Sequence, residues 1–158
     1  MALDHLTVAC VVERHGRFLF VEELVGGEHV INQPAGHVEP GETFPQAVVR
    51  ETLEETAWEF EPRAIVGLYL WTHPESGERF LRAVFTGELG RHDPERQLDE
   101  GILRAVWLSR DDLLARQAQW RSPMVIRAVD DYLAGRRFEL DMLSHVDFAA
   151  LAERAQVV

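Results

Sequence analysis

The sequence predicts an α/β fold in which a mixed β-sheet lies between helices. Short apolar runs rich in β-branched residues recur along the chain, beginning with LTVACVV at residues 6–12. One well-capped helix interrupts these runs in mid-chain, and further helices follow the last of them. Strands flanked by helices in this order favour a sheet that is covered by helices on its faces.

The strands follow from the apolar runs and the turns between them. Residues 6–12 and 18–22 form a hairpin around Gly16, and a loop at 23–29 with Gly26-Gly27 leads to a short strand at 30–33. Later strands are expected at 64–71, 79–87 and 103–108. A turn at 73–78 separates the first two of these, and residues 90–101 form a long polar loop.

The helices are marked by their caps. Thr43 is the N-cap of a helix over 44–56, and Gln46 completes a capping box. A short helix is expected over 110–116, with Ser109 as its N-cap. A final helix begins at Ser122-Pro123 and ends at Gly135.

Three glutamates gather on the mid-chain helix. Glu51, Glu54 and Glu55 stand at i, i+3 and i+4, so their carboxylates fall within an arc of about 100°. Such a cluster is either a solvated acidic stripe or a site for a hard divalent cation such as Mg²⁺, which prefers oxygen ligands.

The apolar neighbours of these glutamates favour the metal site. The first two turns of the same stripe carry apolar residues, namely Phe44, Ala47 and Val48. Val49 and Leu53 add an apolar patch on the opposite side, so we expect the helix to be enclosed. Carboxylates that face a cleft are costly unless they are paired or bound to metal.

This stretch resembles the signature of the Nudix hydrolase family. The matching residues are Gly36, Glu42, Arg50-Glu51, Glu54-Glu55 and Trp58. Thr52 replaces an apolar residue of that signature and Ala57 replaces its last glycine, where Ala57 would alter how the helix ends.

The resemblance implies a Nudix α/β/α sandwich and a Mg²⁺-dependent hydrolase, with Mn²⁺ as a substitute metal. It adds the Gly36 carbonyl to Glu51, Glu54 and Glu55 as metal ligands. Arg50 either orients a carboxylate or forms a surface salt bridge, and Glu42 is expected to hold the loop before the helix. For the general base the order of preference is Glu54, Glu51, Glu55.

Other candidates are less specific. Asp99 and Glu100 precede Trp107, but Gly101 stands nearest the position where the family places a further acid. His37 either contacts a phosphate or has no such role. The remaining aromatic candidates would stack on a base or pack in the core, and core packing is favoured for them: Tyr69, Trp71, Phe80 and Trp107.

The similarity extends beyond the signature, and four segments resemble the NudJ phosphatase branch of the family. They are HLTVACVV from His5, RFLFVEE from Arg17, NQPAGHVEPGET from Asn32, and RSP from Arg121. The branch implies release of inorganic phosphate from nucleoside tri- and diphosphates and from hydroxymethylpyrimidine pyrophosphate. The alternatives are a pyrophosphohydrolase acting on nucleoside triphosphates or ADP-ribose-type dinucleotides, and a non-catalytic Nudix-fold binding module.

Composition agrees with one globular domain over residues 1–158. The residues are 46% hydrophobic and 27% charged, and no apolar run approaches a membrane span. The formal net charge of −11 argues against nucleic acid as a partner, but not against a small phosphorylated substrate. The single cysteine, Cys10, and the lack of a secretory signal suggest the cytoplasm, and nothing indicates the oligomeric state.

Overall fold

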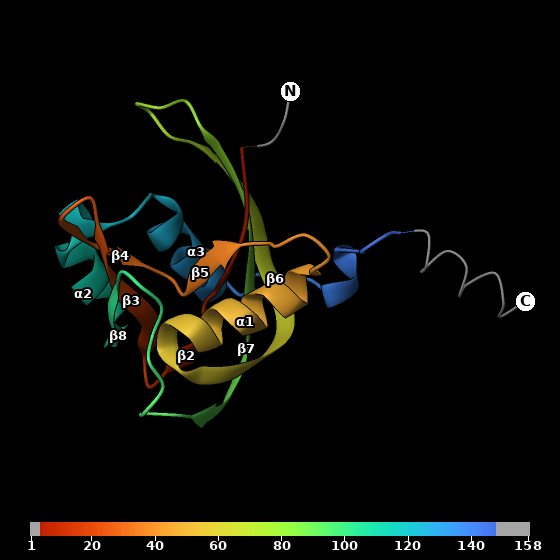
Figure 1. Cartoon of the computed structure of the whole chain (residues 1–158), viewed down its shortest axis with the longest axis horizontal. Coiled ribbons are helices and arrows are strands. Elements are labelled where there is room, and N and C mark those ends of the chain that lie inside the picture. Colours follow the sequence, from red (N-terminus) through yellow and green to blue (C-terminus); the bar gives the residue numbers. More distant parts are fainter. Residues whose placement is uncertain (1–3, 148–158) are drawn as a thin grey trace, which may run out of the picture.

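The computed structural model describes residues 4–147 and contains two β-sheets with helices packed around them (Figure 1). The strands are β1 (His5–Cys10), β2 (Glu13–Arg14), β3 (Arg17–Val25), β4 (Glu28–Asn32), β5 (Ala35–His37), β6 (Trp58–Thr72), β7 (Arg79–His92) and β8 (Ile102–Leu108). The helices are α1 (Phe44–Thr56), α2 (Arg110–Ala115) and α3 (Met124–Leu133), with short 3₁₀ turns at Gln117–Gln119 and Leu140–Met142.

The larger sheet has the strand order β5-β1-β7-β6 and is mixed, as the sequence predicts. Strand β1 runs parallel to β7, whereas β1 pairs antiparallel with β5, and β6 pairs antiparallel with β7. The smaller sheet has the order β2-β3-β4, and β8 pairs with β3. Ala35–His37 therefore lies at the edge of the larger sheet, directly after the loop that leaves the smaller one.

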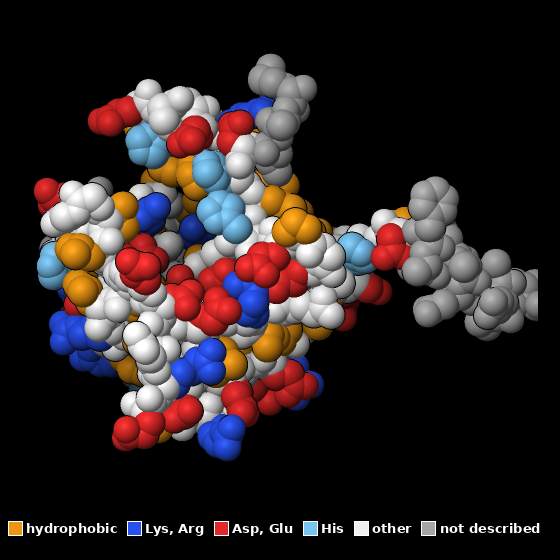
Figure 2. Space-filling model, in the orientation of Figure 1, with side chains coloured by type: hydrophobic (Ala, Val, Ile, Leu, Met, Phe, Trp, Pro, Cys, Tyr) orange, Lys and Arg blue, Asp and Glu red, His pale blue; other side chains and the backbone are white. Residues whose placement is uncertain are grey.

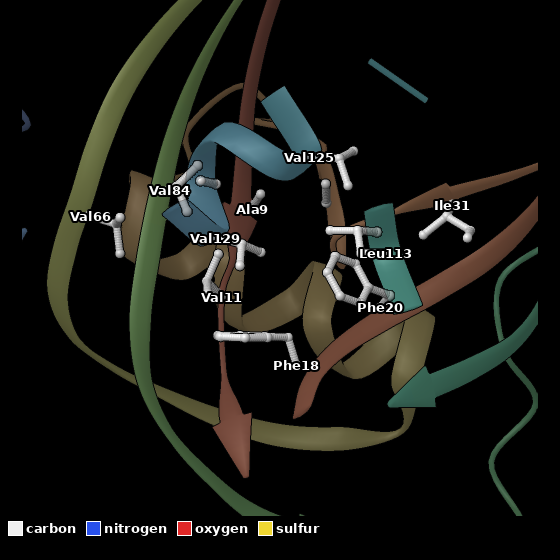
Figure 3. Close-up of a cluster of buried hydrophobic side chains, with 12 residues drawn as sticks. Ala9, Val11, Phe18, Phe20, Ile31, Val66, Val84, Leu113, Val125 and Val129 are labelled. Atoms are coloured by element: carbon white, nitrogen blue, oxygen red, sulfur yellow. The ribbon is translucent and has the colours of Figure 1, made fainter. Parts of the chain in front are cut away.

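Successive side chains of β1 point to opposite faces of the larger sheet. Val8 and Cys10 pack in the cluster that contains Ala47 and Val48 of α1. Ala9 belongs to the opposite cluster (Figure 3), which combines β-sheet residues with α2 and α3; its members are Ala9, Val11, Phe18, Phe20, Ile31, Ala35, Val66, Val84, Leu113, Val125, Ala128 and Val129. The larger sheet therefore lies between α1 on one face and α3 on the other, which confirms the α/β/α arrangement.

Helix α1 begins and ends where the sequence predicts. The Thr43 side chain accepts a hydrogen bond from the Gln46 backbone amide, and the Gln46 side chain accepts one from the Thr43 amide. The expectation that α1 is enclosed on two sides is wrong, because Val49 is 36% exposed. The buried face also carries Thr52, whose hydroxyl donates to the Cys10 sulfur at 3.4 Å in place of an apolar contact.

The structure differs from the sequence prediction in strand pairing and in strand length. The predicted hairpin of residues 6–12 with 18–22 is wrong, because β1 pairs with β5 and β7 in the larger sheet and only β2 pairs with the start of β3. Strand β6 begins at Trp58 instead of residue 64, and β7 continues to His92, since the two strands pair along their whole length with register shifts near Pro62. The predicted loop at 23–29 shrinks to a turn around Gly26-Gly27, because β3 and β4 extend toward it. No helix among residues 4–147 is both long and apolar enough to cross a membrane.

Candidate active site

The Arg50 side chain lies at the centre of a group of acidic residues. Its Nε donates to Glu42 Oε1 at 2.7 Å, and its Nη2 donates to Glu42 Oε2 at 3.0 Å. Its Nη1 contacts Glu51 Oε1 at 2.7 Å and Glu54 Oε2 at 3.1 Å, and Nη2 also donates to the His37 carbonyl at 3.0 Å. Arg50 therefore joins the loop before α1 to two carboxylates of the helix, which is more than a surface salt bridge provides.

Three carboxylates come together beside this arginine. One oxygen from each of Glu51, Glu54 and Asp99 lies within 4.8 Å of the others. The loop that carries Asp99 is held against α1 because the Asp99 amide donates to the Glu54 carbonyl at 3.0 Å. Figure 2 shows acidic side chains gathered over α1 around a basic side chain, next to a hollow. Oxygen ligands at this spacing suit a hard divalent cation.

The backbone at Gly36 lies directly against Glu51. A Cβ at this glycine would come within 2.1 Å of the Glu51 carboxyl carbon, so no larger residue fits there without moving that carboxylate. The side chain of Glu51 is 11% exposed, and burial raises the pKa of its carboxyl while Arg50 lowers it. Gly36 thus brings main-chain atoms beside the Glu51 carboxylate, and its role as a metal ligand stays a prediction.

Glu55 lies beside the three-carboxylate group without being part of it. Its Oε2 accepts a hydrogen bond from the Ala35 amide at 3.0 Å, and the residue is 6% exposed. Burial raises the pKa of Glu55 to about 9, and the charges of Glu23, Glu51 and Asp99 act in the same direction. A nearby cation would offset this cost, and the place of Glu55 in a metal site stays a prediction.

A cavity of about 750 Å³ opens beside Glu51 and Glu55. Its wall also includes Gly36, a pair of aromatic rings and two arginines. The rings are Trp71 and Phe80, whose centroids lie 5.5 Å apart, and the arginines are Arg82 and Arg121. One cavity therefore joins acidic, basic and aromatic walls, which suits a ligand with an anionic end and a ring.

The remaining predicted residues fall into two groups. The Tyr69 hydroxyl donates to Asp131 at 2.8 Å, and Trp107 packs against the α1 cluster, so both have the structural role that the sequence favoured. Trp71 and Phe80 instead line the cavity. The His37 side chain lies on the cavity wall, and its Nε2 is 2.8 Å from Nδ1 of His5, at hydrogen-bond distance.

The loop before β8 carries two further acids, Asp99 and Glu100. The structure brings Asp99 into the carboxylate group, whereas Glu100 lines a smaller hollow next to it. Sequence reasoning did not single out Arg82 for the cavity, although a charged residue inside the apolar run FLRAVFTG was a visible signal. Arg121 had appeared only as part of the RSP segment.

Comparison with known proteins shows the family of this chain. The NUDIX domain model matches residues 3–128. The chain is 38% identical over 143 residues to phosphatase NudJ of Shigella boydii and of Escherichia coli K12, covering 90% of this chain and 92% of each relative. A solved NUDIX hydrolase from Nitrosomonas europaea is 46% identical with a TM-score of 0.88, covering 91% of this chain and 98% of that one. The chain therefore belongs to the Nudix family.

Proposed function

We propose that this Nudix hydrolase is a Mg²⁺-dependent phosphatase that releases inorganic phosphate from nucleoside tri- and diphosphates. The observation that carries the proposal is the group formed by Glu51, Glu54 and Asp99 at the edge of a cavity with basic and aromatic walls. The similarity to phosphatase NudJ over 90% of the chain supports phosphate release over release of pyrophosphate. Hydroxymethylpyrimidine pyrophosphate is proposed as a further substrate, since it also joins a ring to a diphosphate.

The residues that would hold the metal are Glu51, Glu54, Glu55 and the Gly36 carbonyl, with Asp99 as an added ligand. When bound, Mg²⁺ offsets phosphate charge and lowers the pKa of a water ligand; Mn²⁺ would substitute for it. Arg50 holds Glu51 and Glu54 at fixed positions through its Nη1, as a positioning residue. Glu54 is the preferred base because its side chain is 28% exposed, against 11% for Glu51, so water reaches it more readily.

The charge of the protein limits its partners. With a formal net charge of −11, we expect small phosphorylated substrates and no nucleic-acid partner. We also place the activity in the cytoplasm, which agrees with a single, fully buried cysteine, Cys10.

Product analysis tests the proposal. Each of the four nucleoside triphosphates is incubated with enzyme and Mg²⁺, and the products are separated by chromatography over time. We expect diphosphate first and monophosphate later, with orthophosphate released at each step. Discrimination among bases should be weak, because contacts to phosphate and metal are common to all four substrates.

The pattern of products separates this activity from its alternatives. Monophosphate and pyrophosphate appearing together without a diphosphate intermediate would reject the phosphatase proposal and indicate a pyrophosphohydrolase. No turnover of any nucleotide or of hydroxymethylpyrimidine pyrophosphate would favour a binding module.

A further inference from the structure

Arg82 places a buried guanidinium in the wall of the cavity. It lies on β7 two residues before Val84, which belongs to the core cluster packed under α3. Although the residue is only 5% exposed, it lines the cavity together with Glu51 and Glu55. A charged group at this depth needs partners for both its charge and its donors.

The partners that the protein supplies to Arg82 are incomplete. Its Nη1 donates to Asn32 Oδ1 at 3.1 Å, which is a neutral acceptor. Its Nε is buried and has no hydrogen-bond partner among the described residues. Within residues 4–147 no carboxylate oxygen lies within 4.0 Å of this guanidinium. The side chain therefore keeps a donor and a positive charge that an anion would satisfy.

The second arginine of the cavity differs in this respect. Arg121 lies 3.7 Å from a Glu23 carboxylate oxygen and its side chain is 41% exposed, so its charge is already compensated and partly solvated. Burial lowers the pKa of Arg82 to about 10, yet the group stays protonated near neutral pH. Arg82 is thus the cavity arginine with unused binding capacity.

The strand register shows where Arg82 lies relative to strand β5, which carries Gly36. On the larger sheet, Thr7 of β1 pairs with His37 of β5 on one side and with Arg82 of β7 on the other. Since neighbouring strands lie about 4.8 Å apart, the main chains of His37 and Arg82 are separated by roughly 10 Å. In the next row of β7 and β6, Phe80 pairs with Trp71. Arg82 therefore lies between strand β5, which carries Gly36, and the paired rings of Phe80 and Trp71.

We infer that Arg82 binds a phosphate oxygen of the substrate, at the phosphate that lies between the metal site and the ring. This inference rests on the proposed function, because it assumes a substrate with a diphosphate group. Asn32 fixes the guanidinium through Nη1, and Nε is enclosed; Nη2 has no hydrogen-bond partner among the described residues and is not enclosed, so it is the donor that the anion can reach. The cost of a buried unpaired charge in the free enzyme is then recovered when the substrate binds.

The alternative is that Arg82 only balances the nearby acids Glu23 and Glu55, whose charges act on it. Both readings are tested with Arg82→Gln and Arg82→Lys. The probe is methylenediphosphonate, whose P–C–P bridge is not hydrolysed, titrated calorimetrically in the presence of Mg²⁺. The melting temperature of each protein without the probe is measured alongside. Arg104→Gln is the matched control, because Arg104 is a 67% exposed arginine that pairs with Glu22 away from the cavity.

If Arg82 binds phosphate, the variants should differ in their affinity for the probe in a specific order. Arg82→Gln should weaken methylenediphosphonate binding at least tenfold with an unchanged or higher melting temperature, and Arg82→Lys should bind with intermediate affinity. Arg104→Gln should bind like the wild type.

Equal affinity of Arg82→Gln and wild type would overturn the inference, as would a wild type that fails to bind the probe. If Arg82→Gln does not fold, loss of affinity in a folded Arg82→Lys decides the matter, and unaltered affinity there rejects the inference. The proposed function fails separately, through the absence of nucleotide turnover.

Discussion

At the scale of single residues, the acidic group is held together by one side chain. Glu51 and Glu54 both contact Nη1 of Arg50, while the rest of its guanidinium is occupied by Glu42 and the His37 carbonyl. These hydrogen bonds raise the pKa of Arg50 and lower that of Glu42, so both stay charged. Arg50 offsets part of the repulsion but cannot neutralise all nearby acids, which leaves a net negative site for a cation.

Removing one charge from this group should abolish most of the activity. Glu54→Gln and Glu51→Gln keep size and helix propensity but remove a ligand charge. We expect turnover at saturating Mg²⁺ to fall by about two or more orders of magnitude in each variant. Steady-state kinetics with a nucleoside triphosphate measures this, and circular dichroism checks that the fold is kept.

Glu59→Gln is the control, since Glu59 is exposed near the start of β6 and lies outside the cavity. It should retain the turnover of the wild type. Near-normal turnover in Glu54→Gln would show that Glu54 is neither the base nor a required ligand.

At the scale of secondary-structure elements, the end of α1 carries a local conflict. Ala57 adopts a left-handed conformation with φ 61° and ψ 15°, and its amide donates to the Leu53 carbonyl at 2.9 Å. Glycine adopts this conformation without strain, whereas alanine costs about 1–2 kcal/mol there. The conformation is imposed because β6 begins at once, with Trp58 paired to His92. The departure from the family signature thus leaves the geometry of the helix end intact but strained.

Ala57→Gly should therefore stabilise the protein slightly. Relief of strain is opposed by loss of a buried methyl group, about 0.8 kcal/mol, because Ala57 is 3% exposed. We expect a net gain between zero and about 1 kcal/mol in the free energy of unfolding, measured by urea denaturation. The control is Ala134→Gly, at an exposed helix end with φ −71°, where glycine should cost roughly 0.5–1 kcal/mol. A clear destabilisation by Ala57→Gly would refute the strain argument.

At the scale of the whole molecule, local signals were predictable and pairing between distant strands was not. The bounds of α1 follow from Thr43, Pro45 and Gln46, which are neighbours in the chain. The ends of β6 and β7 do not, because pairing carries both strands past Pro62 into polar sequence. Asp99 reaches the site through a loop whose path depends on that pairing, so its spacing from α1 could not be read from the sequence.

The same distinction applies to the wall of the cavity. The glutamates of α1 were predictable because one helix sets their spacing. Arg82 enters the site through its register with Thr7, a residue 75 positions earlier that belongs to another strand. Strand register is fixed by burial over the whole sheet, which local patterns do not determine. The carboxylates of the site could therefore be predicted from the sequence more completely than the basic and aromatic residues of the cavity wall.

Metal binding should stabilise the whole fold, because a cation that binds only the native state shifts the unfolding equilibrium. The bound cation also relieves the repulsion among Glu51, Glu54 and Asp99 that Arg50 does not offset. At a Mg²⁺ concentration about ten times the dissociation constant, the stabilisation is about 1.4 kcal/mol, or roughly 3–6 °C in melting temperature for a chain of this size. Differential scanning calorimetry with MgCl₂ against NaCl of equal ionic strength measures the shift and removes general screening. Glu55→Gln should show a clearly smaller shift than wild type, while Glu59→Gln should show the full one. Equal shifts in wild type and Glu55→Gln would mean that Mg²⁺ binds without Glu55, at the three-carboxylate group alone or elsewhere on the acidic surface.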